Sequence, residues 1–301
     1  MAKTFLITGA TGLIGGYLIE AILKRGDEYI AATTDPVKAE KKLKGYKKIV
    51  SLDSISLLNT EKIDVVINLA GSNLGSRRWT DPAKKDFYDS RINTTNSLVE
   101  LFKHMYKKPE VIISASGVDY YGDIGNRAMY EDAPPADTFL GKLVNDWEQA
   151  ALKAEGEGVR TVVLRTGFVI AKNSEAVKKL LMPVRFFVGG PLGSGRQYVS
   201  WIHIDDLVGI YIFSADNKNV SGIYNAAAPE SVTNAEFTKH AAKLLHRPAF
   251  MLTPAFMIKA IVGEMSTVVL DGRRALPDKI INAGYQFKFV NDMDAWKDVL
   301  S

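Results

Sequence analysis

Gly9-Ala10-Thr11-Gly12-Leu13-Ile14-Gly15 is the stretch of this chain that decides its fold. It follows a short apolar run at residues 4–8 and opens an amphipathic pattern over 14–24. Gly9 permits a tight turn, Gly12 lets backbone approach a diphosphate, and Gly15 lets a helix pack on a strand. Free N–H groups at the start of that helix bind phosphates. The spacing and its context therefore predict a dinucleotide-binding loop.

Strand-like and helix-like segments alternate through the first half of the chain. Strands are predicted at residues 4–8, 29–33, 48–50, 64–69, 110–115 and 160–165, and helices over 14–24, 83–105 and 138–154. This alternation predicts an α/β fold, a Rossmann-type doubly wound parallel sheet. Right-handed crossovers place the carboxyl ends of the strands at one edge, so functional residues are expected directly after the strands.

The second half is less regular. Helices are predicted near 175–187 and 234–245, with a glycine loop at 189–195 between them and a strand-helix pair at 200–215. We expect residues 1–170 to form the dinucleotide-binding domain, with about 200–228 returning to it. Residues 171–301 are expected to form a smaller, mostly helical substrate lobe. A chain of 301 residues with 47% hydrophobic residues can bury a core of this size.

Composition excludes several classes of function. The absence of cysteine excludes disulfides and thiolate nucleophiles, and the four histidines lack metal-ligand spacing, so no metal is expected. A net charge of +4 with scattered lysines argues against a nucleic-acid partner. No apolar run approaches the length of a membrane span, about 20 residues. Strand-like residues begin at Thr4, so no signal peptide is expected. We therefore expect no membrane partner and predict a cytoplasmic protein.

The residues leave the choice between NAD and NADP open. Asp35 lies 20 positions after Gly15, where an acid would bind an unphosphorylated ribose and favour NAD. Asp35-Pro36 is equally a good start for a helix, and the Asp35 carboxylate would then serve as its N-cap. In that case the lysines of the following helix, Lys38, Lys41 and Lys42, are available for a 2′-phosphate.

Motifs along nearly the whole chain resemble one branch of a known superfamily. They are GATGLIG from Gly9, NLAGSNLGSRRWT from Asn68, SRINTTNSLV from Ser90, SASGVDYYGD from Ser114, NDWEQAA from Asn145, LRTGFVI from Leu164, GGPLGSGRQYVSWIHIDDL from Gly189, YNAAAPESVTNAEF from Tyr224 and PAFMIKAIVGEMSTVVLDGRRALP from Pro254. The chain resembles the atypical extended short-chain dehydrogenases/reductases, in the epimerase-like branch that carries a C-terminal domain of unknown function. The resemblance implies a Rossmann-type domain that binds NADP or NAD, and reactions such as ketone reduction, epimerisation or dehydration.

The resemblance also implies which residues contact the cofactor. They are Gly9, Thr11, Gly12, Leu13, Ile14 and Gly15 in the loop, Leu69, Ala70 and Gly71 after the fourth strand, and Arg165, Thr166 and Gly167 after the sixth. Ser114, at the end of the fifth strand, is predicted to line the cofactor. Thr34, beside Asp35, stands where relatives commonly carry an arginine for a 2′-phosphate. This departure weakens the NADP inference, and NADP stays slightly favoured.

The catalytic dyad usual in the superfamily is absent. A Tyr-x-x-x-Lys pair transfers a proton from one face of a helix, and its two positions here hold Leu140 and Val144. Ser116 matches the superfamily's serine, and Tyr120 or Tyr121 could present a hydroxyl near the nicotinamide. Against these catalytic roles stand a turn role for the serine and simple aromatic packing for the tyrosines.

Other polar residues are candidates for substrate binding. Arg77 and Arg78 could clamp an anion, with Trp79 as an apolar wall and Arg196 facing the cleft from the lobe. The same arginines could equally be solvated. Val199 stands where nucleotide-sugar enzymes carry a phosphate-binding arginine, which argues against such a substrate.

Three further side chains are predicted to have structural rather than catalytic roles. His203, with its acidic neighbours Asp205 and Asp206, is predicted to cap a helix. Trp147 is expected to pack beneath the cleft, and Glu148 to be a helix-surface or lobe-contact charge.

The leading hypothesis is an NAD(P)-dependent oxidoreductase acting on a small, anionic, non-nucleotide substrate. One alternative is a catalytically impaired dinucleotide-binding sensor, motivated by Leu140 and Val144. Another is an epimerase that uses transient oxidation. A homodimer is expected only by analogy with the fold.

Overall fold

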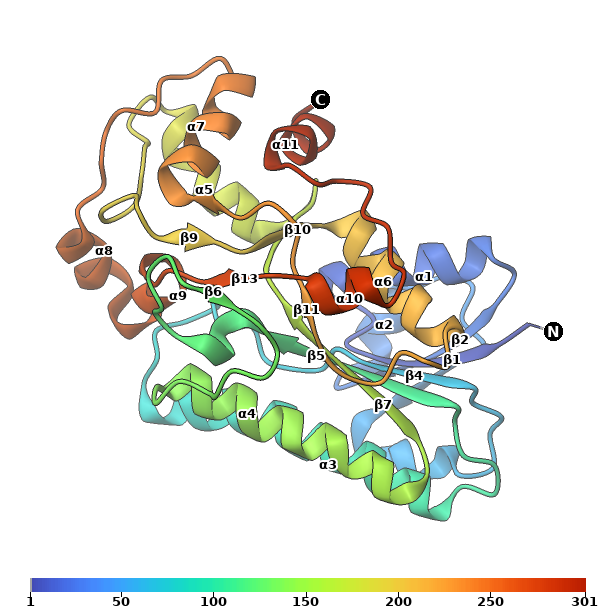
Figure 1. Ribbon diagram of the computed structural model, residues 1–301. Helices are drawn as coiled ribbons and strands as arrows, with labels where there is room; N and C mark the ends of the chain where they lie inside the picture. Colours follow the sequence, from blue (N-terminus) through green and yellow to red (C-terminus); the bar gives the residue numbers. More distant parts are fainter. Residues whose placement is uncertain (1) are drawn as a thin grey trace.

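The main sheet of the computed structural model, which describes residues 2–301, has seven strands (Figure 1). They are β1 (Thr4–Thr8), β2 (Glu28–Thr33), β3 (Lys48–Ser51), β4 (Val65–Asn68), β5 (Val111–Gly117), β7 (Arg160–Thr166) and β11 (Gly222–Ala226). All neighbours pair in parallel, in the order β11-β7-β5-β4-β1-β2-β3. The predicted fold class is confirmed. The order reverses between β1 and β4, the switch point at which such sheets bind ligands.

Helices cover both faces of this sheet. On one face lie α1 (Leu13–Lys24) and α6 (Ile204–Asp216), and on the other α3 (Asp81–His104) packs beside α4 (Phe139–Leu152) (Figure 1). The alternation of β1 explains the two layers, because Phe5 packs with α1 and α6, whereas Leu6 packs with α3. Shorter helices are α2 (Pro36–Lys42), η1 (Leu52–Leu58), η2 (Val118–Tyr121), η3 (Lys153–Glu157) and α10 (Asp278–Asn282).

A separate apolar core forms the lobe. Helices α5 (Glu175–Arg185), α7 (Asn234–Leu244) and α11 (Asp292–Leu300) surround Trp201, Phe237 and Trp296. Two small strand pairs support them. Strand β8 (Phe168–Ile170) pairs in parallel with β10 (Trp201–His203), and β9 (Tyr198–Val199) pairs antiparallel with β12 (Val232–Thr233). Since β8 follows β7 directly, the lobe is tied to the carboxyl end of the main sheet.

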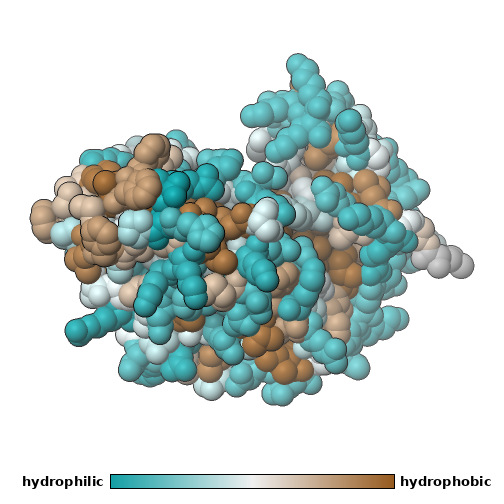
Figure 2. All heavy atoms as spheres, turned by 90° about the horizontal axis from the view of Figure 1, so that it is seen from above, coloured by the Kyte–Doolittle hydropathy of each residue, from teal (hydrophilic) through white to brown (hydrophobic). Residues whose placement is uncertain are grey.

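The C-terminal segment returns to the loop after β5. It runs through α8 (Ala255–Val262), η4 (Gly263–Ser266) and α9 (Thr267–Leu270) to β13 (Arg274–Ala275), which pairs with β6 (Ala128–Met129). Exposed apolar side chains gather over α8, at the left of Figure 2, and include Phe256, Met257 and Ile261. Within residues 2–301, no helix combines the length and apolar character needed to cross a membrane.

Candidate functional site

The glycine loop after β1 has room for a ligand because its glycines lack side chains. Gly9 has a φ of 68°, and a Cβ there would lie 2.8 Å from the carbonyl oxygen of Leu69. A Cβ on Gly15 would lie 2.6 Å from the carbonyl oxygen of Gly9. Gly12 is the N-cap of α1 and offers no side-chain cap to the N–H groups of the first turn. The loop therefore fits the diphosphate of a dinucleotide.

A cavity of about 320 Å³ lies along the carboxyl ends of β1, β2 and β4. It is lined by Gly9, Thr11, Gly12, Thr33, Thr34, Leu52, Leu69, Ala70, Gly71, Ser72, Ser90 and Thr94. Seven of the residues predicted to bind the cofactor are among them. Leu13, Ile14 and Gly15 begin the helix behind the loop, whereas Asp35, Ser114, Arg165, Thr166 and Gly167 do not line this cavity.

Buried hydrogen bonds hold the turn after β4 in place. The Thr8 hydroxyl accepts from the backbone N–H groups of Leu69 and Ala70, both at 3.1 Å, and donates to Asn68. The Asn68 amide in turn donates to the hydroxyls of Thr95 and Ser114. Ser114 is 1% exposed, so its hydroxyl supports the cavity wall from behind. Sequence reasoning missed Asn68, although it opens one of the motifs.

Asp35 caps a helix. Its Oδ1 accepts from the backbone N–H of Lys38 at 3.0 Å, at the start of α2. Lys42, in the last turn of the same helix, donates to the carbonyl oxygen of Thr11 in the glycine loop. Of the two roles considered for Asp35, the geometry supports the N-cap.

A closed polar network fills the carboxyl ends of β5 and β7. Arg165 forms a bidentate ion pair with Glu148 of α4, with Nε–Oε1 and Nη2–Oε2 distances of 2.8 Å. Both side chains are 1% exposed. Ser116 donates to the same carboxylate. Glu148 is thus a buried partner of two strands, and its expected role as a helix-surface or lobe-contact charge was wrong.

The tyrosines of η2 belong to this network. The Tyr121 hydroxyl accepts from Arg165 Nη1 at 2.9 Å and donates to Asn225 at 2.7 Å. Burial raises the pKa of Tyr121 to about 12. The ring of Tyr120 lies under the Arg165 guanidinium, 3.4 Å from Cζ. Ser116 and Tyr121 therefore belong to one hydrogen-bond network, in which both hydroxyls bind protein groups. Their catalytic role stays a prediction.

The two dyad positions on α4 are apolar and buried. Val144, 5% exposed, packs on the tyrosines of η2, and Leu140, 3% exposed, packs with Trp79 and Phe87. Trp147, 7% exposed, donates through its indole N–H to Thr95. No side chain of this helix face offers the proton-transferring pair of the superfamily.

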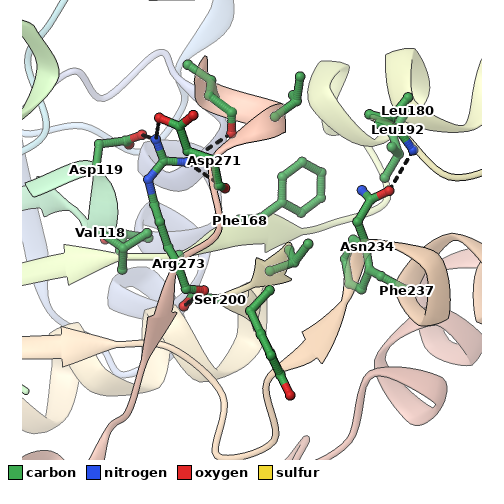
Figure 3. A pocket seen from close by; sticks show the side chains of 16 residues that line it. Val118, Asp119, Phe168, Leu180, Leu192, Ser200, Asn234, Phe237, Asp271 and Arg273 are labelled. Carbon is green, nitrogen blue, oxygen red and sulfur yellow. Dashed lines mark hydrogen bonds and ion pairs between the residues drawn. The ribbon is translucent and has the colours of Figure 1, made fainter. Parts of the chain in front are cut away.

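A second cavity, of about 240 Å³, lies beyond the carboxyl ends of β5 and β7 (Figure 3). Its wall is mostly apolar, with Val118, Phe168 and Phe237 among the lining side chains. At one end Arg273 reaches Asp119, with Nη2 and Oδ1 3.1 Å apart, and lies 3.5 Å from Asp271 (Figure 3). Thr166 and Gly167 line this cavity. Sequence reasoning missed Asp119, Asp271 and Arg273, although DGRR lies in a quoted motif.

The predicted substrate residues lie elsewhere. Arg77 pairs with Asp86, and Arg78 donates to the carbonyl oxygens of Ala260 and Ile261, at 2.8 and 2.7 Å. Trp79 is 9% exposed and donates to the carbonyl oxygen of Leu74. Arg196 is exposed on the glycine loop of the lobe. None of the four lines either cavity.

The His203 group is structural, as predicted. The His203 ring accepts from the N–H of Asp205 as the N-cap of α6, and burial lowers its pKa. Asp206 accepts from the backbone N–H groups of Lys288 and Phe289 and from the Tyr285 hydroxyl. The Asp206 carboxylate thus fixes the C-terminal chain to α6.

Comparison with known protein families gives two matches. The model described as the NAD dependent epimerase/dehydratase family matches residues 5–227, and a domain of unknown function, DUF1731, matches residues 253–299. Among curated relatives, epimerase family protein SH2119 of Staphylococcus haemolyticus is 38% identical over 309 residues. Epimerase family protein SAR0825 of Staphylococcus aureus is 36% identical over 311 residues. Each alignment covers 99% of both chains.

Solved structures share the same architecture. Human epimerase family protein SDR39U1, crystallised with NADPH, superposes with a TM-score of 0.91 and 32% identity over 99% of both chains. The nucleoside-diphosphate sugar epimerase of Corynebacterium glutamicum gives a TM-score of 0.77 and 28% identity, covering 100% of this chain and 58% of that one. Both likenesses span the sheet and the lobe.

Proposed function

The chain belongs to the NAD dependent epimerase/dehydratase family, and on that premise we propose that it is an NADP(H)-dependent oxidoreductase acting on a small substrate. The observation that carries the proposal is the pair of cavities at one edge of the sheet. One lies at the ends of β1, β2 and β4 and the other at the ends of β5 and β7. A dinucleotide whose diphosphate binds at Gly12 would extend from the first toward the second.

The preference for NADPH over NADH rests on Asp35 and its helix. An acid that is to bind an unphosphorylated ribose must turn its carboxylate toward the 2′-hydroxyl, and the Asp35 carboxylate accepts from its own helix instead. The lysines Lys38, Lys41 and Lys42 supply positive charge beside it. The human relative crystallised with NADPH supports the same choice.

In the proposed reaction the nicotinamide, when bound, supplies or accepts a hydride at the end of β5 and β7. Thr166 and Gly167 would form its wall, and the apolar side chains of the second cavity would exclude water from the substrate. Asp271 lines the same cavity, and burial raises the pKa of its carboxyl, so we propose it as the group that exchanges a proton with the substrate's oxygen. Ser116 and Tyr121 would position β5 and β7 through Glu148 and Arg165.

The test begins with cofactor binding. We expect NADPH to quench protein fluorescence and to bind at least about tenfold more tightly than NADH, since a 2′-phosphate adds charge-assisted contacts. Stereospecifically deuterated NADPH is then incubated with a library of small ketones and keto acids. Deuterium found in an alcohol product supports the proposal, and tight binding without deuterium in any product contradicts it.

A second candidate function is a dinucleotide-binding sensor without catalysis. The specific observation in its favour is that Ser116 and Tyr121 both bind protein groups. This alternative predicts NADPH binding that changes the association of a partner protein, and no isotope transfer. The deuterium experiment therefore separates the two functions.

A further inference from the structure

Asn234, the first residue of α7, lines the second cavity and uses only one half of its side-chain amide within the protein. Its Oδ1 accepts from the backbone N–H of Leu192 at 2.8 Å, which holds the glycine loop of the lobe against α7. Because a backbone N–H can only donate, this contact fixes which amide atom is the oxygen. Among residues 2–301 the nitrogen, Nδ2, donates to no group.

The unused nitrogen faces the cavity. Figure 3 shows the amide nitrogen of Asn234 turned into the cavity, with the amide oxygen on the side of Leu192. The residue is 4% exposed, and Nδ2 is not among the side-chain atoms that are sealed off without a partner. A ligand in the cavity can therefore reach it. A buried donor that stays unpaired costs about 1–3 kcal/mol, so an acceptor on the ligand would stabilise this site.

The opposite end of the cavity carries charges that are already paired (Figure 3). Arg273 pairs with Asp119 and lies 3.5 Å from Asp271. Its Nη1 and Nη2 also donate to the carbonyl oxygens of Val268 and Thr267, each at 3.2 Å. Among the described residues that line the cavity there is no other lysine, arginine or histidine. A carboxylate or phosphate on the ligand would thus be buried without a counter-charge, which is costly.

The space between the two ends suits a small apolar body. Phe168, Leu180 and Phe237 contribute to its wall. The volume of about 240 Å³ is about eight times the ~30 Å³ that one water molecule occupies in the liquid. The cavity therefore fits a short molecule that offers a hydrogen-bond acceptor to Asn234 and carries no net charge.

We propose that Asn234 binds the substrate by donating from Nδ2 to a second carbonyl oxygen, and that the substrate is an uncharged carbonyl compound with an apolar body. This role rests on the proposed function and adds the substrate class. The reacting carbonyl lies at the end of the cavity that contains Asp271, and the bond to Asn234 sets its orientation. An uncharged substrate departs from the anion expected from Arg77 and Arg78, which line neither cavity.

The experiment is a calorimetric titration of the full chain saturated with NADP⁺, the oxidised cofactor, so that no ketone is reduced during the measurement. The ligands are the methyl esters of levulinic acid and of its next two longer homologues, which place two carbonyl groups at increasing spacing. Each ester is compared with its own acid and with an unbranched methyl ketone of similar length. We expect at least one ester to bind about threefold to tenfold more tightly than the ketone and at least about tenfold more tightly than the acid.

Asn234→Asp replaces the amide donor with an acceptor. It keeps an oxygen for the N–H of Leu192 and places an acid in the first turn of a helix, where an acid is favourable, so the fold should persist. Ester affinity should fall by about tenfold or more, whereas the simple ketone should bind within about threefold of its affinity for the wild type. The matched control is Asn217→Asp, outside both cavities, whose Oδ1 likewise accepts from a backbone N–H, that of Asn219 at 3.0 Å. It should bind the esters like the wild type.

The proposal is overturned if the wild type binds none of the esters, or binds the acids as tightly as the esters. It is also overturned if Asn234→Asp and Asn217→Asp bind the esters equally well. If Asn234→Asp does not fold, the comparison of ester, acid and ketone in the wild type decides. If ester binding depends on Asn234 but no deuterium passes from NADPH to any ester, the oxidoreductase proposal fails and the assignment of Asn234 stands.

Discussion

The two halves of the sheet edge use different chemistry. Over β1, β2 and β4 the site is made of backbone, with glycines that leave room and N–H groups that remain available. Over β5 and β7 it is made of side chains. Ser116 and Arg165 both donate to Glu148, and the Tyr121 hydroxyl accepts from Arg165 and donates to Asn225. A backbone site depends on a few glycines, whereas a side-chain site can be rebuilt by substitution. The first half is therefore expected to be sensitive to added side-chain volume, and the second to the loss of a single polar group.

The largest expected effect comes from breaking the Arg165–Glu148 ion pair in the side-chain network over β5 and β7. Glu148→Gln leaves the Arg165 charge buried without its partner, and breaking such a pair costs about 3–5 kcal/mol. We expect a correspondingly lower free energy of unfolding by urea denaturation, with NADPH affinity preserved at temperatures where the variant is folded. Glu100→Gln, on the exposed surface of α3, is the control and should leave the denaturation midpoint unchanged. Equal midpoints for the two variants would contradict the role given to Glu148.

The glycine loop after β1 is tested by adding one methyl group. Gly15→Ala would place a Cβ against the backbone of Gly9 and Ala10, which should lower stability by about 1–3 kcal/mol and NADPH affinity by at least tenfold. Gly16→Ala, one residue further along α1, meets nothing within 4 Å and should bind NADPH normally. Calorimetric titration of both variants checks this, and equal affinities would show that the loop is not the phosphate site.

Tyr121→Phe removes one hydroxyl from the side-chain network over β5 and β7. Arg165 Nη1 and the Asn225 side chain each lose a partner, so we expect destabilisation by about 1–3 kcal/mol. The raised pKa of Tyr121 means that the folded state holds this proton more tightly than the unfolded chain does. The stability it contributes is complete below pH 10 and is lost as the pH rises toward about 12. Urea denaturation of both proteins between pH 9 and pH 12 should show a smaller loss in the variant.

The smallest expected effect is that of Asp35→Asn. Asparagine is as good an N-cap as aspartate, so stability should change by less than about 0.5 kcal/mol. If the carboxylate has no contact with a ribose, NADH affinity should also stay within about twofold, or 0.4 kcal/mol. A tenfold loss of NADH affinity would instead identify Asp35 as a ribose-binding acid.

The features that sequence could predict are those encoded locally. The glycine loop, the empty dyad positions Leu140 and Val144, and the capping group around His203 each depend on neighbours in the chain or on one helix. Glu148 and Arg273 could not be assigned in the same way, because their partners lie on other elements. Arg165 is 17 positions from Glu148, and Arg273 reaches Asp119 from the far end of the chain. Contacts of this kind become visible only when the strand ends are brought together.

A crystal structure of the protein with NADPH tests the proposed cofactor site most directly. We expect the diphosphate at the N–H groups that follow Gly12 and the nicotinamide at the ends of β5 and β7, facing the cavity lined by Asp119 and Arg273. A nicotinamide turned away from that cavity, or a diphosphate bound away from the glycine loop, would contradict it.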